Sequence, residues 1–443
     1  MQTTKLSITD TFGLGFMAFA FFLGAGNLIF PPFAGFLAGE NMSLAMLGFL
    51  LTAVGMPLIG LIAVAKANGK IMAYLPPFAA TALAIAIYII IGPAFAAPRT
   101  SLVAFEIGAR PFIANPDAVV MIAGQSVNIA QLIFTLVFFS IVMLMSLFPG
   151  KLLDNVGKVL TPILISLLVA LAMSVLFLSG SDIGAPSAEY LSSPLSKGII
   201  EGYNTMDTLA SIMFGMLIID LLRKKGIENA ADQTKYLIRA AIIAASGLAF
   251  VYISLFFLGA SAGDLATGAS NGGAILTNYV DHHFGLLGII MLSAVVGLAC
   301  LTTAIGLVTA CSEFFNELLP KISYQHFVIF FSVVCATVAN VGLSQLISIS
   351  IPVLMTIYPV AIALVLITLI TPKFARPAFS QRLVLSIALA FGILDGLKTA
   401  GVDMSAFNFL PLHAEGMAWL LPTAIVTIVC LFLPKMAQPH SVA

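Results

Sequence analysis

An apolar stretch long enough to cross a membrane, near the start of the chain, is interrupted at its centre. Residues 15–36 read GFMAFAFFLGAGNLIFPPFAGF, and Gly24, Ala25, Gly26 and Asn27 stand in the middle. Because a bilayer offers no partner for free backbone N–H and C=O groups, a helix that unwinds there must line a cavity or be covered by protein. The freed groups can then hold a solute, which is typical of the discontinuous helices of secondary transporters.

Glycine-mediated packing between membrane helices is the alternative explanation of this motif. Packing alone requires neither Asn27 beside the glycines nor Pro31 and Pro32 a few residues later. The prolines remove two amide donors and disfavour a regular helix. The combination therefore favours a break in the helix that serves a function.

Composition indicates that the whole chain is a membrane protein. Of its 443 residues, 60% are hydrophobic and 9% are charged, whereas soluble domains carry about 25% charged residues. We therefore predict an all-α polytopic membrane protein with a single transmembrane domain over residues 1–443, surrounded by membrane lipid. Since the net charge is zero, no basic surface for nucleic acid is expected, and nothing indicates an obligatory protein partner.

About twelve transmembrane helices are expected, since a spanning helix needs about 20 apolar residues. With the N-terminus in the cytoplasm, 15 of the 19 Lys and Arg residues fall on the inner side. This bias follows the positive-inside rule and predicts that both termini are cytoplasmic. The predicted segments are 10–36, 44–65, 80–106, 128–148, 158–179, 199–222, 237–260, 285–311, 325–341, 346–371, 382–397 and 417–434.

The sixth segment is a second candidate for a broken helix. Its outer half carries several polar side chains, among them Asp207, Thr208 and Ser211. An ionisable residue within a span indicates a functional site by default, although a place near the outer interface, bonded to a helix terminus, is the alternative for Asp207. The break is expected somewhere between Thr205 and Gly215.

The first and sixth segments are five positions apart. That offset is expected if segments one to five and six to ten form a 5+5 inverted repeat, in which each half opens with a discontinuous helix. The repeats would cover about residues 10–179 and 199–371, and two additional C-terminal helices would occupy residues 382–434.

The eighth segment contains a candidate ion site. Ala299 is followed three and four positions later by Thr302 and Thr303. Sodium is expected to prefer such neutral oxygens together with backbone carbonyls from an unwound helix. The alternative is that the hydroxyls bond the preceding carbonyls of their own helix.

Three stretches of the chain resemble one family. They are residues 15–32, the GPAFAAPRT run at 92–100, and GYNTMDTLASIMFG at 202–215. With them, the chain resembles the BrnQ-type branched-chain amino acid carriers, the leucine-isoleucine-valine:cation symporters of bacteria. The resemblance implies the amino acid–polyamine–cation superfamily fold. It also implies import of Leu, Ile and Val with sodium across the cytoplasmic (inner) membrane.

The resemblance further implies where the sodium ion binds. In the wider superfamily, one site joins two carbonyls of the first helix to an alanine and two hydroxyl residues of the eighth. The second sodium site of that group uses an asparagine of the seventh helix, and the seventh segment here contains none. We therefore expect one coupling ion, no other cofactor, and these ligands: Ala20, Leu23, Ala299, Thr302 and Thr303.

A branched-chain amino acid needs donors for its carboxylate, acceptors for its ammonium group and an apolar wall. Free amides at the start of a half-helix suit the carboxylate. The ammonium group would meet free carbonyls, and Asp207 is a weaker candidate for this role because its position in the sixth segment places it toward the outer side. The expected substrate residues are Gly24, Ala25, Gly26, Asn27, Tyr88, Asp207, Thr208, Ser211, Phe214 and Leu307, with Ile212 as a further apolar neighbour.

Two other functional classes compete with sodium-coupled import. A proton-coupled transporter or exchanger of neutral amino acids is the alternative, and Asp207 is then the fair candidate for the proton-carrying group. An enzyme is not expected, because no clustered catalytic constellation is present. Arg99 and Glu106 are candidates for an outer gate pair, and the alternative is that their side chains reach the membrane interface.

Overall fold

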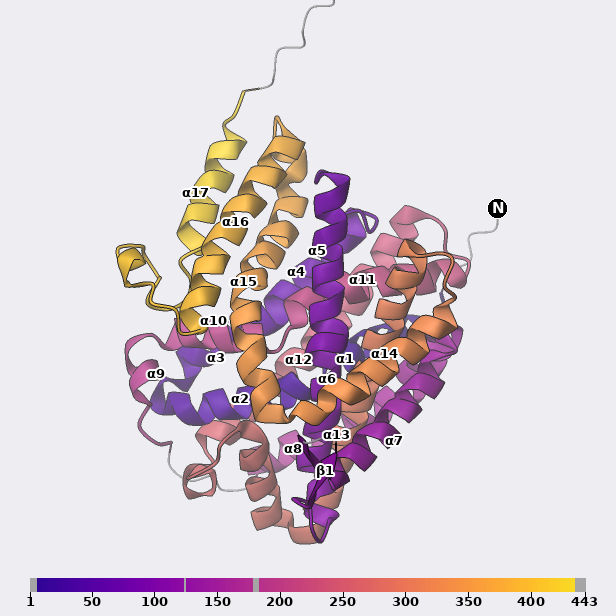
Figure 1. Cartoon of the computed structure of the whole chain (residues 1–443), viewed down its shortest axis with the longest axis vertical. Coiled ribbons are helices and arrows are strands. Elements are labelled where there is room, and N and C mark those ends of the chain that lie inside the picture. Colours follow the sequence, from indigo (N-terminus) through magenta and orange to yellow (C-terminus); the bar gives the residue numbers. More distant parts are fainter. Residues whose placement is uncertain (1–5, 123–124, 178–182, 435–443) are drawn as a thin grey trace, which may run out of the picture.

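The computed structural model describes residues 6–122, 125–177 and 183–434, and most of these residues are helical. The strands in this part of the chain are β1 (Val119–Ile122) and β2 (Gln125–Asn128), an antiparallel hairpin in which Val119 pairs with Asn128. The predicted all-α class is therefore confirmed (Figure 1).

Seventeen α-helices and several shorter helical turns make up the described chain. The α-helices are α1 (Ile8–Phe22), α2 (Ala25–Ala38), α3 (Met42–Leu50), α4 (Met56–Lys66), α5 (Pro77–Ile89), α6 (Ala96–Val103), α7 (Ile129–Ser146), α8 (Thr161–Phe177), α9 (Ala188–Ser192), α10 (Pro194–Asn204), α11 (Asp207–Lys224), α12 (Ala230–Ala260), α13 (Gly272–Leu318), α14 (Tyr324–Val338), α15 (Leu343–Ile370), α16 (Pro377–Thr399) and α17 (Leu420–Leu431). The π-helical turns are Leu51–Gly55, Ile90–Ala94, Ala104–Ala109 and Leu153–Leu160.

Each predicted membrane segment overlaps helix in the described part of the chain, and residues 178 and 179 of the predicted segment 158–179 lie outside the described residues. Nine helical stretches of the described chain are long and apolar enough to cross a membrane, or ten if α10 and α11 count as one bent span. The apolar helices α1 and α17 are too short to be counted among these stretches. The count of twelve crossings and the bounds of the two repeats therefore stay predictions.

Both predicted interruptions are present. Helix α1 ends at Phe22 and α2 begins at Ala25, with Gly24 in an extended conformation between them. Helices α10 and α11 meet at a bend of 40°, where Met206 has a positive φ of 67°. Pro31 and Pro32 lie inside α2 and do not end it.

The broken helices lie in the centre of the bundle. Most residues of α2 and α11 are buried, and α12 packs along both α1 and α2. Helices α12 and α2 approach each other closely at Gly259, which has no side chain. A Cβ atom at this position would collide with the carbonyl group of Pro32, so glycine is needed at this contact. Helix α16 packs between α15 and α17 to one side of the bundle (Figure 1).

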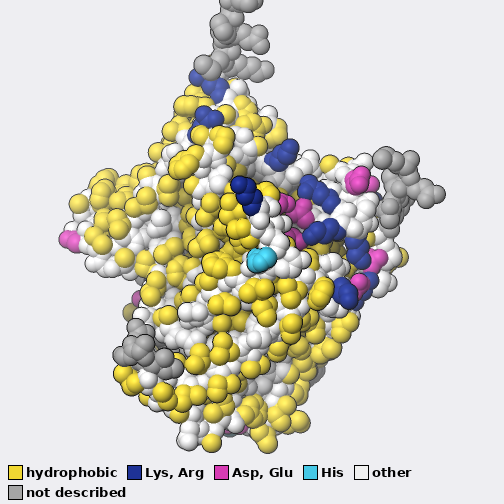
Figure 2. Space-filling view, turned by 45° about the vertical axis from the view of Figure 1, so that its right-hand side comes forward, with side chains coloured by type: hydrophobic (Ala, Val, Ile, Leu, Met, Phe, Trp, Pro, Cys, Tyr) yellow, Lys and Arg dark blue, Asp and Glu magenta, His cyan; other side chains and the backbone are white. Residues whose placement is uncertain are grey.

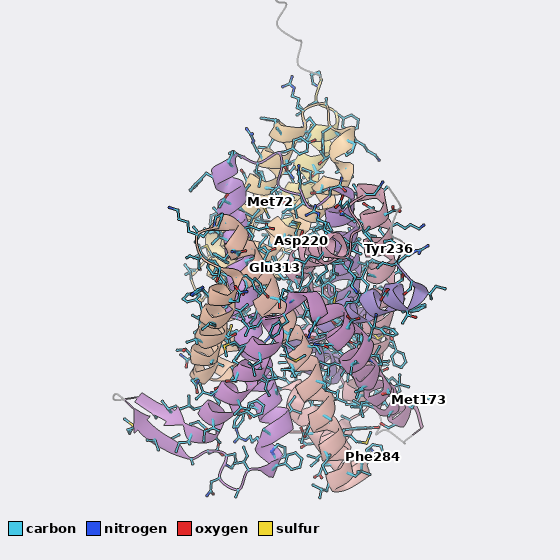
Figure 3. All side chains as sticks on the ribbon, turned by 90° about the vertical axis from the view of Figure 1, so that its right-hand side faces the viewer. Met72, Met173, Asp220, Tyr236, Phe284 and Glu313 are labelled. Carbon is cyan, nitrogen blue, oxygen red and sulfur yellow. The ribbon has the colours of Figure 1, made fainter. Side chains whose placement is uncertain are left out.

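Charge is concentrated toward one end of the molecule. On the face shown in Figure 2, the Lys and Arg side chains gather in the upper part, and hydrophobic side chains dominate the rest. Figure 3 places Asp220, Glu313 and Tyr236 toward that end, and Met173 and Phe284 toward the other. At the charged end, Lys224 of α11 pairs with Glu313 of α13 at 2.5 Å.

Candidate functional site

A narrow cavity of about 20 Å³ lies where the two broken helices meet. A volume of this size accommodates about one water molecule, so the surrounding helices must move apart to admit an amino acid. The cavity is lined by Phe21, Phe22, Gly24, Ala25, Gly26, Asn27, Ile91, Ala96, Arg99, Thr100, Thr205, Met206, Asp207, Ala210, Phe214, Thr303 and Leu307.

The structure brings most of the predicted substrate residues to this cavity. Seven line it: Gly24, Ala25, Gly26, Asn27, Asp207, Phe214 and Leu307. The remaining four, Tyr88, Thr208, Ser211 and Ile212, are buried outside its lining.

Three of these side chains have identified partners elsewhere. The ring of Tyr88 stacks on Phe314, with ring centroids 4.1 Å apart. The Thr208 hydroxyl donates to the Thr52 carbonyl at 3.2 Å, and the Ser211 hydroxyl donates to the Thr208 carbonyl at 2.6 Å. Thr208 and Ser211 thus support the helices around the cavity without lining it.

Asp207 joins the two breaks directly. It is the first residue of α11 and is only 2% exposed. Its Oδ2 atom accepts hydrogen bonds from the Asn27 side-chain amide at 2.7 Å and from the Tyr252 hydroxyl at 2.8 Å. Asn27 in turn accepts a hydrogen bond from the Gly24 amide at 3.1 Å through its side-chain oxygen. Asp207 is therefore part of the centre of the site and not of the outer interface.

The predicted ion ligands also lie close together. The Thr303 hydroxyl is 3.0 Å from the Ala20 carbonyl oxygen, and the Thr302 hydroxyl is 3.2 Å from the same oxygen. The Thr302 hydroxyl also lies 2.9 Å from the Leu298 carbonyl and 3.0 Å from the Ala299 carbonyl of its own helix. The alternative in which the hydroxyl bonds carbonyls of its own helix is therefore present at Thr302. Thr303 lines the cavity, and sodium binding by these residues stays a prediction.

Leu23 follows the last residue of α1, with φ of −72° and ψ of 81°. This geometry takes it out of the helix. Its carbonyl therefore belongs to the unwound segment from which an ion ligand was expected.

Arg99 is a charged lining residue whose position the sequence did not reveal. It is 3% exposed and donates to the Asn204 carbonyl at 3.0 Å. Glu106 instead pairs with Arg110, at 3.0 Å, so the hypothesis of a gate pair is wrong. The alternative that the Arg99 side chain reaches the membrane interface is also wrong, because Arg99 is buried at the cavity. A kink at Gly92, whose ψ is −112°, precedes the helix α6 that carries Arg99. The GPAFAAPRT run carried the signal for such a kink, because its first glycine and proline disfavour regular helix.

Comparison with known proteins places the chain in a family. The family described as Branched-chain amino acid transport protein matches residues 7–437. The chain is 44% identical over 439 residues to the branched-chain amino acid transport system 2 carrier protein of Pseudomonas aeruginosa, covering 98% of each. It is 40% identical over 447 residues to the branched-chain amino acid permease BrnQ of Escherichia coli K12, again covering 98% of each.

Two solved structures share the fold at low sequence identity. A Na⁺-coupled sialic acid symporter aligns with a TM-score of 0.57 at 12% identity, covering 97% of this chain and 91% of that one. MhsT in complex with L-phenylalanine aligns with a TM-score of 0.50 at 18% identity, covering 95% of this chain and 96% of the other. The fold is therefore the one predicted, with discontinuous first and sixth helices. The chain belongs to the bacterial branched-chain amino acid transport family, whose members are multi-pass membrane transport proteins and not enzymes.

Proposed function

We propose that this protein imports leucine, isoleucine and valine by sodium-coupled symport, through alternating access. The observation that carries the proposal is the meeting of two broken helices at one buried cavity, where Asp207 of the second break bonds Asn27 of the first. Discontinuous helices at the centre of a bundle expose backbone donors and acceptors to a solute. The relatives that transport branched-chain amino acids support the substrate class.

The amino acid would be held by both breaks. The first amides of α2, at Ala25 to Asn27, have no acceptor within their own helix because they belong to its first turn. Their orientation and the helix dipole favour a carboxylate. Phe214 and Leu307 would provide apolar contact for the side chain. Such a pocket separates substrates differing by one methylene by only about 1–3 kcal/mol, so overlapping use of the three amino acids is expected.

Sodium would bind between α1 and α13. The Ala20 carbonyl and the Thr303 hydroxyl are within 3.0 Å of each other, and Ala299, Thr302 and Leu23 are the remaining expected ligands. All of these groups are neutral oxygens. Their place beside the first break would link ion binding to the conformation of the substrate-binding backbone.

The protein would lie in the cytoplasmic membrane with both termini in the cytoplasm. The support is the bias of Lys and Arg in the sequence and the gathering of basic side chains toward one end of the molecule (Figure 2). Basic residues are enriched on the cytoplasmic side of bacterial membrane proteins.

Uptake of labelled leucine by the purified protein in liposomes tests this function. We expect uptake under an inward sodium gradient, competition by excess isoleucine and valine, and no competition by lysine or glutamate. Uptake driven by a proton gradient without sodium would contradict sodium coupling and favour the proton-coupled alternative. Absence of leucine uptake under both gradients would contradict the proposed substrate.

A further inference from the structure

Arg99 places a buried positive charge at the cavity, beside the first break. Its side chain is 3% exposed, and its Nη1 atom donates to the Asn204 carbonyl. Its Nε atom is buried and has no hydrogen-bond partner among the described residues. A Cβ atom added to Gly26 would lie 2.6 Å from Arg99 Nη2, so the guanidinium group reaches the first turn of α2.

No carboxylate of the described chain neutralises this guanidinium group by direct contact. The ion pairs between described residues do not include Arg99. Burying a charge without a counter-ion is unfavourable. The interactions present, one backbone carbonyl and the face of the Phe30 ring 5.4 Å away, use only part of the five donors of a guanidinium group.

Asp207 lines the same cavity with the opposite charge. Its contacts are hydrogen bonds from neutral side chains, Asn27 and Tyr252. The cavity thus has a positive and a negative group that are both buried and not paired with each other. A free amino acid carries the same two charges, separated by one carbon atom.

We propose that Arg99 recognises the carboxylate of the substrate, together with the first amides of α2, while Asp207 faces its ammonium group. The inference rests on the proposed function and names the feature of the substrate that the cavity selects, which is the zwitterion. A guanidinium group binds a carboxylate through two parallel hydrogen bonds. The bound substrate would then supply the direct ionic contact that each buried charge lacks.

The test compares leucine with leucinamide, which retains the ammonium group and the side chain but lacks the carboxylate. The readout is the ligand-induced rise in the unfolding temperature of the purified full-length protein over a wide range of ligand concentrations, which yields apparent affinities even for weak ligands. We expect the wild-type protein to prefer leucine by about 30-fold or more, as is typical for loss of one partner of a buried charged pair.

In Arg99→Gln, leucine binding should weaken by a similar factor while leucinamide binding changes by less than about threefold, so the preference largely disappears. Arg99→Lys keeps the charge but loses the forked geometry, and should retain an intermediate preference. It also carries the test if Arg99→Gln fails to fold. Arg110→Gln is the matched control, because Arg110 pairs with Glu106 and Asp117 away from the cavity, and it should keep the wild-type preference.

Equal weakening of both ligands in Arg99→Gln and Arg99→Lys would overturn the inference, because it would mean that Arg99 acts only by holding Asn204. Equal binding of the two ligands by the wild-type protein would also overturn it. Both results leave the proposed function standing. If leucine fails to stabilise the wild-type protein at all, the proposed function fails and this inference fails with it.

Discussion

The two helix breaks that form the cavity are built in different ways. The first break contains Gly24 and Gly26, but Gly24 is in an extended conformation that other residues also adopt, with φ of −114°. The second break contains no glycine, and Met206 there has a φ of 67°. The residue with the left-handed backbone is thus the methionine.

The glycines of the first break instead leave space for the side chains of neighbouring helices. A Cβ atom on Gly24 would lie 2.9 Å from Thr303 Cγ2, and one on Gly26 would lie 2.6 Å from Arg99 Nη2. At the second break the left-handed conformation costs about 1–2 kcal/mol for a residue other than glycine. Met206 is 1% exposed, so its buried side chain offsets that cost.

The largest effect is expected from removing the charge at the second break. Asp207→Asn keeps the shape of the side chain but removes the partner of the substrate ammonium group, and should weaken leucine binding by about 30-fold or more. Uptake of labelled leucine in liposomes measures this effect. Asp395→Asn is the matched control, because Asp395 is also buried but lies in α16, outside the cavity lining.

If Asp207→Asn retains leucine uptake and changes only the driving ion, Asp207 carries the coupling proton and not the substrate. That outcome would contradict its expected role and favour proton coupling.

A smaller effect is expected at the ion side of the first break. Thr303→Val preserves the shape of the side chain but removes its hydroxyl. It should raise the sodium concentration for half-maximal uptake by about tenfold, because one polar contact to a charged group contributes a free energy of about this size. Thr302→Val should have a smaller effect, because the Thr302 hydroxyl also bonds carbonyls of its own helix. Unchanged sodium dependence in both variants would remove this ion site.

The space at the first break is tested by adding one methyl group at a time. Gly26→Ala should raise the leucine concentration for half-maximal uptake about fivefold, since overpacking costs about 1 kcal/mol or more. Gly24→Ala should mainly alter sodium dependence, because its Cβ atom would contact Thr303. Gly297→Ala is the control, because its added Cβ atom meets no atom within 4 Å. Identical effects of the first two variants would argue against separate roles for the two glycines.

The smallest effect concerns the backbone of the second break. Met206→Gly and Met206→Ala both remove the buried side chain, but only glycine tolerates a positive φ without strain. We expect Met206→Gly to be the more stable by about 1 kcal/mol, measured by thermal unfolding. The same two substitutions at Met213, inside α11, should show the opposite order of stability, because alanine is favoured over glycine in a regular helix. If alanine is the more stable at both positions, Met206 is not strained.

Most of the bundle could be predicted from the sequence, because lipid imposes long apolar helices and makes polar interruptions conspicuous. The glycines and Asn27 mark the first break, and the family resemblance places Ala20 and Thr303 near each other as expected ligands of one ion. The second break was located only to within residues 205–215. Its hinge, Met206, has no local propensity for a left-handed backbone, so no sequence pattern could mark it.

The sequence by itself determined the membrane class, the segments that form helices and the chemical types of residue available at the two breaks. These follow from hydropathy and backbone chemistry, which act locally. Only the tertiary structure decided that Tyr88 packs on Phe314 away from the cavity, and that Arg99 turns inward to Asn204 and leaves Glu106 to Arg110. Such choices depend on helices far apart in the chain, since the environment of a side chain is set by the elements packed around it.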